Sequence, residues 1–543
     1  MRALTAPLYE LSEFEEIRKL LKKPGKYAAL TGCVESQKLH MAYGLSEGLR
    51  CRLIVTFSDQ RMKELQEDYR FYDRNTTCFP ARDVIFYQAD IHGNQLTKER
   101  IRCFRRMMEG RPFTVVTTFG SLLAPQIPLS VFRDNVITVS CNGSLDEKKM
   151  AEELVKLGYE NVYQVEAPGQ FSIRGGIIDI FDLTEENPYR IELWGDDVES
   201  IRSFDVQSQR SIEKLSSITI YPACELILTE EQLKKGMERI EKESKRFSEK
   251  LRKEFKTEEA HRVEEQMNTL KEEVFAYKSL ANLDGYVRYF YEDTVSFLNC
   301  LDVENSIVFL DEPARIREHA SAVELEFRES MSHRLEKGYI LPGQADFLYS
   351  VAEVTARMSA FRLASLAALD LKGGLLKPDW KADISAKSIS SYNNSFEALV
   401  SDLQRYKKNG YRVLLLSGSR TRAKRLAADL SEDGLTSFYT EDPDREIKPG
   451  EIMTFYGRVF RGFEYPLLKF AVISESDIFG AEKKKKKKKK QYEGRKINDF
   501  SELSVGDYVV HENHGLGIYQ GIEKVEVEKV VKDYIKISYR DGG

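Results

Sequence analysis

The chain has 543 residues, 31% of them charged, and a formal net charge of -5 at pH 7. It is too long for one hydrophobic core and has no overall nucleic-acid charge signature, so several domains are expected and any DNA contact must be local. It has no run of about eighteen apolar residues, no signal-peptide layout and no CxxC pair among its seven cysteines, which predicts a cytoplasmic protein without membrane contact, disulfide framework or zinc site.

Residues 27–49 read as a short apolar strand, a glycine-containing turn and a helix. A phosphate-binding loop of the form GxxxxGKS/T would lie here, with glycines that bring N–H groups to the phosphates and a lysine that neutralises them. Ala29 and Val34 stand at the two glycine positions. Glu35 stands at the lysine position, and only Ser36 is retained. Because a carboxylate repels a triphosphate, we predict a degenerate nucleotide site that keeps the fold and not the nucleotide.

The next segment alternates strands and helices, as α/β domains do. We assign residues 1–124 to the first part of a degenerate RecA-like (P-loop) domain. The expected strands are 52–58 and 83–87, the expected helices are 59–72 and 96–109, and residues 113–123 are expected to form a strand and a turn.

The stretch 164–210 alternates with period two and breaks at turn residues such as Gly175-Gly176 and Asn187-Pro188. This pattern predicts three or four half-buried antiparallel strands, in a small β domain at 125–221 inserted into the RecA-like domain.

The period also sorts side chains by face, because neighbours along a strand point to opposite sides. Ile191 and Leu193 point one way, and Arg190, Glu192 and Trp194 point the other. In an earlier strand Phe171 and Ile173 share the apolar side, while Ser172 and Arg174 share the polar one. Exposed Trp and Arg are enriched at interface hot spots. The alternative is that Trp194 covers a neighbouring core and the arginines are ordinary surface charge.

The strings FSIRGGIIDIFDL and YRIELWGDDVESIRSFDVQSQRS resemble domain 2 of the nucleotide-excision-repair protein UvrB and, more closely, the same module in the bacterial transcription-repair coupling factor (Mfd) family. In that family the module docks onto UvrA. The resemblance implies that the contact positions, two arginines and an aromatic residue, fall on Arg174, Arg190 and Trp194. UvrB also carries a tyrosine-rich hairpin that probes damaged DNA, and the compact span 79–95 here puts such lesion verification in doubt.

A strongly charged region from Thr229 to about Lys278 has apolar residues at spacings of three and four, which predicts long amphipathic helices packed on a neighbouring domain. A partner-binding coiled coil is the alternative. We assign residues 222–384 to the part that closes the RecA-like domain. The apolar positions are Leu233, Met237, Ile240, Phe247, Leu251, Phe255, Val263, Met267, Leu270, Val274 and Tyr277.

An apolar strand at 306–311 ends in Asp311-Glu312. This is the Walker B form, in which one carboxylate holds Mg²⁺ and the other positions water. Without the lysine and glycines upstream, these carboxylates are expected to be a relic of the nucleotide site.

A second α/β domain is expected at 385–478, followed by a Lys-rich linker at 479–500. The linker contains eight consecutive lysines, 483–490, which repel one another. They form either a solvated tether or a transient contact to DNA phosphates or an acidic protein surface.

Residues 501–543 alternate through short strands with glycine turns, as in an incomplete Tudor/SH3-like β-barrel. His511 and His514 lack further ligands to complete a metal site. The phrase YVVHENHGLGIYQGI resembles the CarD-like RNA polymerase interaction domain of the same family. The resemblance implies that a strand edge pairs with the polymerase β subunit, near Ile522, Val525 and Val527.

The predicted fold class is α/β multidomain, and the resemblance covers the N-terminal half of the family. It implies transcription-coupled repair, in which a factor recognises RNA polymerase stalled at a lesion, releases it with an ATP-driven motor and recruits UvrA. No intact GxxxxGKS/T occurs in the sequence, so we expect a scaffold without catalytic residues or a cofactor of its own. ATP, Mg and double-stranded DNA would belong to the motor of the full-length protein. The alternatives are a UvrB-like damage-verifying ATPase and a stand-alone UvrA- and polymerase-binding scaffold.

Overall fold

The computed structural model describes residues 1–82, 94–276, 281–291, 293–371, 373–480, 506–511, 515–527 and 530–538. They form two compact units, one within residues 1–480 and the other within residues 506–538. The predicted mixed α/β class is confirmed, with several sheets of which one is entirely parallel. The domain boundaries predicted inside the first unit stay predictions.

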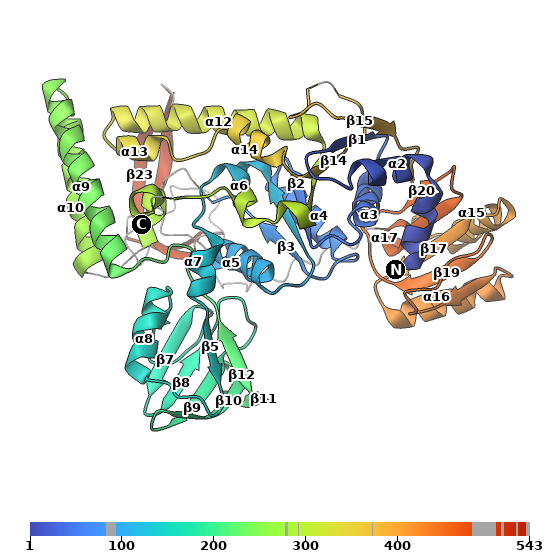
Figure 1. Cartoon of the computed structure of the whole chain (residues 1–543), viewed down its shortest axis with the longest axis horizontal. Helices are drawn as coiled ribbons and strands as arrows, with labels where there is room; N and C mark the ends of the chain where they lie inside the picture. Colours follow the sequence, from blue (N-terminus) through green and yellow to red (C-terminus); the bar gives the residue numbers. More distant parts are fainter. Residues whose placement is uncertain are drawn as a thin grey trace. The chain divides into compact units, whose positions relative to one another are not determined.

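The first sheet has seven strands in the order β15-β1-β14-β13-β2-β4-β3, all parallel (Figure 1). Its inner strands β14, β13, β2 and β4 are buried along almost their whole length, as expected where helices cover both faces. Two distant parts of the chain build it, 27–118 and 306–383. The strands are β1 Tyr27–Thr31, β2 Cys51–Thr56, β3 Thr76–Phe79, β4 Phe113–Thr118, β13 Ser306–Asp311, β14 Arg362–Leu366 and β15 Trp380–Asp383.

The helices joined to this sheet include the predicted ones at α4 and α5, each within a few residues of its expected bounds. The expected strand 83–87 lies outside the described residues. The helices are α1 Arg2–Thr5, α2 Ser12–Leu20, α3 Glu35–Leu45, α4 Asp59–Tyr69, α5 Asn94–Met108, α6 Phe119–Leu123, α7 Leu129–Asp134, α11 Val287–Phe290, α12 Pro313–Glu336, α13 Pro342–Ala345 and α14 Val351–Met358.

The long helix α12 has no counterpart in the sequence prediction. It starts with a proline at its first position, where the missing N–H costs no hydrogen bond. Ile316, Ala320, Phe327 and Met331 are buried at spacings of four, seven and four. These spacings keep one face of the helix on the core.

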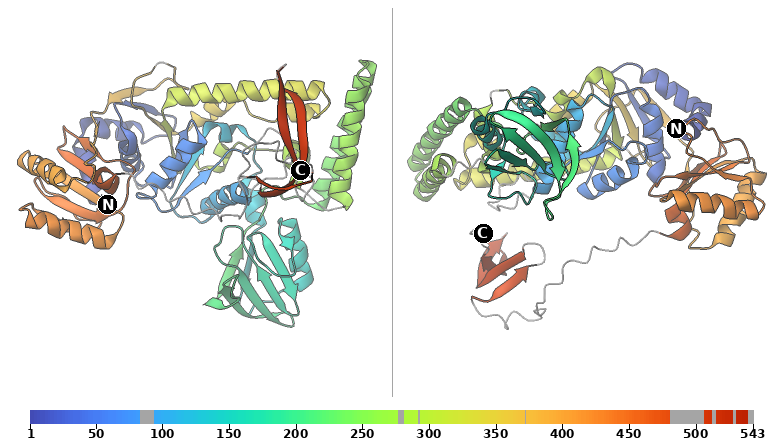
Figure 2. Two further views of the ribbon diagram at one scale, coloured as in Figure 1. Left: turned by 180° about the vertical axis from the view of Figure 1, so that it is seen from behind. Right: turned by 90° about the horizontal axis from the view of Figure 1, so that it is seen from below.

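The inserted β domain is a six-stranded sheet in the order β11-β10-β9-β8-β7-β6, with α8 against β6 and β7 (Figure 2). The first and last strands of this part of the chain, β5 and β12, pair with each other in a separate two-stranded sheet. The elements are β5 Ile137–Ser140, α8 Glu147–Lys156, β6 Glu160–Asn161, β7 Gln170–Arg174, β8 Ile177–Ile180, β9 Tyr189–Trp194, β10 Asp197–Phe204, β11 Ser211–Leu215 and β12 Ser217–Ile220.

The amphipathic helices are confirmed as a pair, α9 Glu230–Lys253 and α10 Thr257–Lys271. A capping box between Thr229 and Gln232 begins the first of them. One predicted apolar position is wrong: Phe255 is 93% exposed and has φ 61°. It lies in the tight turn between the helices, where the left-handed backbone takes its side chain off the buried face.

The second α/β sheet has the order β16-β20-β21-β17-β19-β18. The antiparallel strands at one edge of this sheet, β16 and β20, were not predicted from the sequence, because they are only two and three residues long. The elements are β16 Lys387–Ser388, α15 Phe396–Lys408, β17 Arg412–Ser417, α16 Arg420–Glu432, β18 Ser437–Tyr439, β19 Ile452–Tyr456, β20 Phe463–Tyr465, β21 Phe470–Ser474 and α17 Glu475–Phe479.

The second unit is an antiparallel sheet of β22 Tyr508–His511, β23 Gly515–Val527 and β24 Val530–Ser538. Its assignment as an incomplete Tudor/SH3-like barrel stays a prediction, as does the RecA-like assignment of the first sheet. Among the helices of the described residues, none has the length and apolar content to cross a membrane.

Candidate functional site

The strand register of the inserted sheet places the predicted docking residues on one face. Across β8, β9 and β10, Asp179 pairs with Arg190, and Arg190 with Arg202. Paired residues share a face, and residues two apart along a strand do as well. Arg190 and Trp194 are therefore on the same side of the sheet as Asp179. Ser172 also pairs with Asp179. Arg174 is two residues after Ser172, so it lies on that side as well. We call this side of β7 to β10 the polar face.

The opposite side of the same strands belongs to the main hydrophobic core. Phe171, Ile178, Ile191 and Ile201 are each at most 1% exposed. The predicted sorting of side chains by period two is thus confirmed, and the polar face is held rigid from behind by the packed core.

Arg190 is anchored on the polar face by the buried carboxylate of Asp179. Its Nε donates to Asp179 Oδ1 at 2.6 Å, and its Nη2 donates to Asp179 Oδ2 at 2.8 Å. The hydrogen bonds to Asp179 raise the pKa of Arg190 despite its partial burial. A bidentate pair of this kind fixes the plane of the guanidinium. Arg190 is thus a half-buried, pre-oriented group and not the freely solvated side chain that the pattern suggested.

Arg174 shares the same carboxylate more loosely, with Nη2 at 3.4 Å from Asp179 Oδ2 and a side chain that is 40% exposed. Trp194 ends β9 and is 80% exposed. A tryptophan this exposed covers no neighbouring core, so the alternative interpretation of Trp194 is wrong. An exposed indole on the same sheet face as two guanidiniums has the composition of an interface hot spot.

Sequence reasoning missed Tyr163, which also lies beside this face. Its ring is 83% exposed, and the guanidinium carbon of Arg174 is 5.3 Å from the ring centroid. The Oγ of Ser172 donates to the Tyr163 carbonyl at 2.9 Å, which ties that segment to β7. Tyr163 precedes the alternating stretch, so no period-two signal pointed to it.

The polar face also contains an ion pair between two of its own residues. Glu192 pairs with Arg202 and accepts a hydrogen bond from Ser200 Oγ at 2.6 Å. The carboxylate of Glu192 therefore has its partners within the sheet, whereas the Trp194 side chain is exposed.

The residues of the predicted degenerate nucleotide site surround a lysine that was not among the predicted positions. Lys38, on α3, places its Nζ 2.8 Å from Asp311 Oδ1 and 2.5 Å from Glu312 Oε1. Both carboxylates raise the pKa of Lys38 against the opposing effect of its burial. Arg61 Nε donates to the second oxygen of Asp311 at 3.1 Å. The position where Mg²⁺ would sit on the carboxylates is thus surrounded by two cationic side chains.

The amides of the loop after β1 are also engaged. Gly32 N donates to the carbonyl of Ala368 at 3.3 Å, and Cys33 N donates to that of Ala367 at 3.1 Å. Val34 N donates to Gln37 Oε1 at 3.1 Å. A phosphate loop needs such amides free to donate to the phosphates.

The remaining predicted positions of the nucleotide site have structural contacts. Ala29 is inside β1, and Ser36 Oγ accepts a hydrogen bond from Arg461 N at 3.0 Å. Glu35 is ion-paired with Arg61 at 3.2 Å. Glu312 has φ 59°, a strained value for a residue with a side chain, and its Oε1 also accepts from Ala368 N at 3.0 Å.

The predicted polymerase contacts lie on β23, which pairs with β24 through Ile522–Ile535, Val525–Lys532 and Val527–Val530. The side chains of Ile522, Val525 and Val527 lie outside the described residues, as does His514. Within the described part of the chain, no group of three or more His, Cys, Asp or Glu side chains could hold a metal ion.

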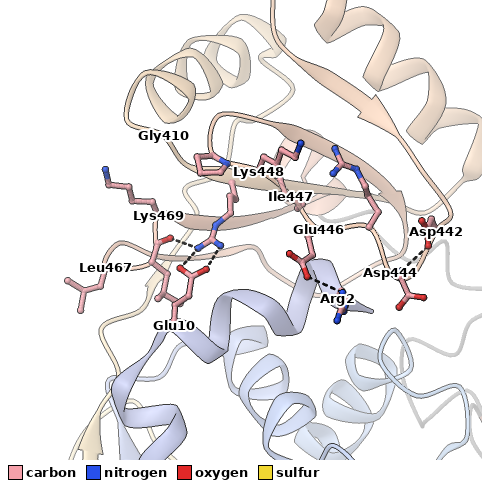
Figure 3. A pocket seen from close by; sticks show the side chains of 14 residues that line it. Arg2, Glu10, Gly410, Asp442, Asp444, Glu446, Ile447, Lys448, Leu467 and Lys469 are labelled. Carbon is pink, nitrogen blue, oxygen red and sulfur yellow. Dashed lines mark hydrogen bonds and ion pairs between the residues drawn. The ribbon is translucent and has the colours of Figure 1, made fainter.

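A cavity of about 880 Å³ opens between the N-terminal residues and the second α/β sheet (Figure 3). Its charges are paired across the junction. Arg412 contacts Glu10 through both guanidinium nitrogens, at 2.5 and 2.8 Å, and Arg2 lies 3.4 Å from Glu446. We interpret this cavity as a structural polar junction.

Comparison with known families places two named modules on the chain. Residues 137–226 match the UvrB interaction domain, and residues 503–543 match the CarD-like/TRCF RID domain. The first match contains the whole polar face, and the second contains β22 to β24.

Curated relatives extend the similarity over most of the chain. The transcription-repair-coupling factor of Bacillus subtilis (strain 168) is 33% identical over 470 residues, which is 86% of this chain and 39% of that protein. The factors of Staphylococcus aureus strains MRSA252 and Mu50 are 27% identical over 545 residues, 99% of this chain and 46% of each relative. The chain thus spans less than half the length of these relatives. The family resemblance found in the sequence is confirmed.

Proposed function

We propose that this chain, which matches the N-terminal half of transcription-repair-coupling factors, recruits repair proteins during transcription-coupled nucleotide-excision repair. In this role it is a scaffold: the inserted β domain binds UvrA, and the C-terminal strands bind the β subunit of RNA polymerase. ATP, Mg and double-stranded DNA are handled by the motor of the full-length factor.

The observation that carries the UvrA proposal is the polar face. Within the span that matches the UvrB interaction domain, Trp194 is 80% exposed and lies on the same face of β9 as Arg190, whose guanidinium is fixed by Asp179. A rigid arginine loses little conformational freedom on binding, and an exposed tryptophan offers a large apolar surface to a pocket. Both properties favour a protein partner.

The polymerase proposal rests on the CarD-like/TRCF RID match and on the length of β23. This strand is central in its sheet, but β22 pairs with it only over 515–518, so among the described strands the rest of β23 is paired on one side alone, by β24. An unpaired strand edge can extend the sheet of a partner by backbone pairing. Ile522, Val525 and Val527 stay the proposed contact positions.

The loop of the degenerate nucleotide site supports a scaffold over a UvrB-like damage-verifying ATPase. Its amides donate to carbonyls at 367 and 368, and its carboxylates are paired with Lys38 and Arg61. Rebuilding a phosphate site would require breaking all of these contacts at once. A stand-alone scaffold without any motor would use the same two docking modules.

The test is a titration of labelled UvrA with the wild-type chain and with Arg174→Ala, Arg190→Ala and Trp194→Ala. Truncation of a hot-spot residue costs about 2 kcal/mol, so each variant should bind about thirtyfold more weakly. Glu192→Ala is the matched control, because Glu192 is on the same strand face but is satisfied by Arg202 and Ser200. The proposal fails if the wild type does not bind, or if all three variants bind like it. A loss at Glu192 as large as at Arg190 would point to a disturbed sheet.

A further inference from the structure

A second cavity, of about 560 Å³, lies where the inserted β domain meets the first parallel sheet. It is formed by the end of α4, the start of β3, the C-terminal half of α5 and the segment before β9. Five arginines line it: Arg70, Arg74, Arg102, Arg105 and Arg106. No part of the proposed docking or nucleotide sites contributes to it.

Three of these arginines come from one face of α5. Arg102, Arg105 and Arg106 are three and four residues apart, a spacing that puts side chains side by side on a helix. Arg105 is held by Glu185 at 2.6 Å and Glu109 at 3.0 Å. The bond to Glu185 ties the basic helix face to the inserted domain, whereas Glu109 directly follows α5 itself.

The other guanidiniums are less well compensated. Within the part of the chain that the structure describes, Arg70, Arg74 and Arg102 have no carboxylate within ion-pair distance. Arg102 Nη2 donates to the carbonyl of Thr184, at 3.2 Å. Arg106 pairs with Glu109 through Nη1, but its Nε is buried and has no hydrogen-bond partner among the described residues.

The electrostatics follow this geometry. Burial lowers the pKa of Arg102, and the neighbouring guanidiniums of Arg106 and Arg70 lower it further. Burial and Arg102 likewise lower the pKa of Lys98, one turn earlier on α5. Burial is the larger cause of both shifts, and the like charges that face one another add to it. An anion in the cavity would relieve this repulsion.

We propose that this arginine cluster binds phosphate groups of a nucleic-acid backbone. Guanidiniums match phosphate oxygens through paired N–H donors. Arg70 and Arg74 are exposed, so the cluster continues from the cavity onto the surface, which suits a chain of phosphates better than one enclosed ion. Two glutamates at the edge, Glu186 and Glu213, are exposed and have room to turn away. Because the chain has a net charge of -5, a contact to nucleic acid requires a region where positive charge is concentrated. The five arginines around this cavity form such a region.

The test is fluorescence anisotropy of a labelled DNA duplex with the full chain, in a background where residues 483–490 are serine. That background is needed because the eight lysines would bind DNA by themselves. The test variant is Arg70→Glu with Arg74→Glu, and the matched control is Arg328→Glu with Arg425→Glu. All four side chains are exposed, so the two variants change the charge equally without disturbing the core.

The test variant should bind the duplex about tenfold more weakly, and its plot of log affinity against log salt should lose roughly two units of slope, one for each phosphate contact. The control should bind like the background protein. Arg102→Gln should also weaken DNA binding. Arg102 is half-buried, so if this variant does not fold, the comparison of the exposed Arg70 and Arg74 variant with its control still tests the proposal. Equal binding by test and control variants overturns the proposal. A test variant that keeps its DNA affinity but loses affinity for UvrA or polymerase also overturns it, because the cluster would then serve an acidic protein surface.

Discussion

Lys38 lies 2.8 Å from Asp311 across 273 positions of sequence, and both side chains are at most 5% exposed. Burial alone would raise the pKa of Asp311, but Lys38 and Arg61 lower it. The pair connects α3 to the end of β13, where the sequence predicts a degenerate nucleotide site. A cation of the chain itself thus neutralises the carboxylate that was predicted to hold Mg²⁺ there.

Lys38→Met should therefore destabilise the fold rather than open a ligand site. Removing one partner of a buried ion pair leaves an uncompensated charge and costs about 3 kcal/mol or more. Chemical denaturation measures this loss, with the exposed Lys63→Met on α4 as the control, which should change stability by less than about 0.5 kcal/mol. Equal stability of the two variants would contradict a structural role for the pair.

Mg-ATP should bind this chain with a millimolar or weaker dissociation constant, because the amides of Gly32 and Cys33 are already bonded to carbonyls. Isothermal titration calorimetry measures the affinity. Glu35→Lys restores the lysine of the motif but leaves those amides engaged, so it should not restore binding. Micromolar binding by the wild type would show that the loop rearranges to accept phosphate.

A buried carboxylate elsewhere makes the stability depend on pH. Burial by itself raises the pKa of Glu225, but the guanidiniums of Arg100 and Arg82 lower it to about 2. Arg100 Nε donates to Glu225 Oε1 at 2.7 Å and joins α5 to the segment after β12. A lowered pKa contributes stability above the unfolded value of 4.5, and this contribution disappears as the pH falls from there towards 2.

The free energy of unfolding should accordingly fall by about 3 kcal/mol more in the wild type than in Glu225→Gln between neutral pH and pH 2. Denaturant titrations at a series of pH values measure the difference. At neutral pH the glutamine variant should be the less stable protein. Parallel pH profiles of the two proteins would rule out Glu225 as the group responsible.

Tyr163 should contribute to the proposed UvrA contact through its ring. The ring holds Arg174 in place before binding, through a cation–π contact within the chain that is worth about 0.5–1 kcal/mol at an exposed site. Tyr163→Ala should free Arg174 and weaken UvrA binding by roughly two- to fivefold at most. Tyr163→Phe keeps the ring over Arg174 and should bind like the wild type. The outcome that counts against this role is equal affinity of the alanine and phenylalanine variants, measured by the same titration as for Trp194.

Local patterns in the sequence were enough to predict the alternating face of the inserted sheet, the strand that ends in Asp311 and the amphipathic pair α9 and α10. The sheet face and the helix pair depend on periods of two and 3.6 residues, and the strand depends on a short apolar run; both are properties of neighbouring residues and need no knowledge of the fold. The strings around Arg174 and Trp194 were enough to indicate the family because they resemble a known module.

The tertiary structure decided which of these residues are available and which are engaged. The sequence could not show that Arg190 is bound by Asp179, or that Lys38 reaches Asp311, because contact energy depends on distance in space and the chain brings such partners together only when the sheets form. It also could not show the arginine cluster, since Arg70 and Arg74 meet Arg102 only after α4 and α5 pack beside β3 and β4. Periodicity therefore determines the side of a strand or helix on which a residue lies. Packing between distant segments determines which charged side chains contact it there.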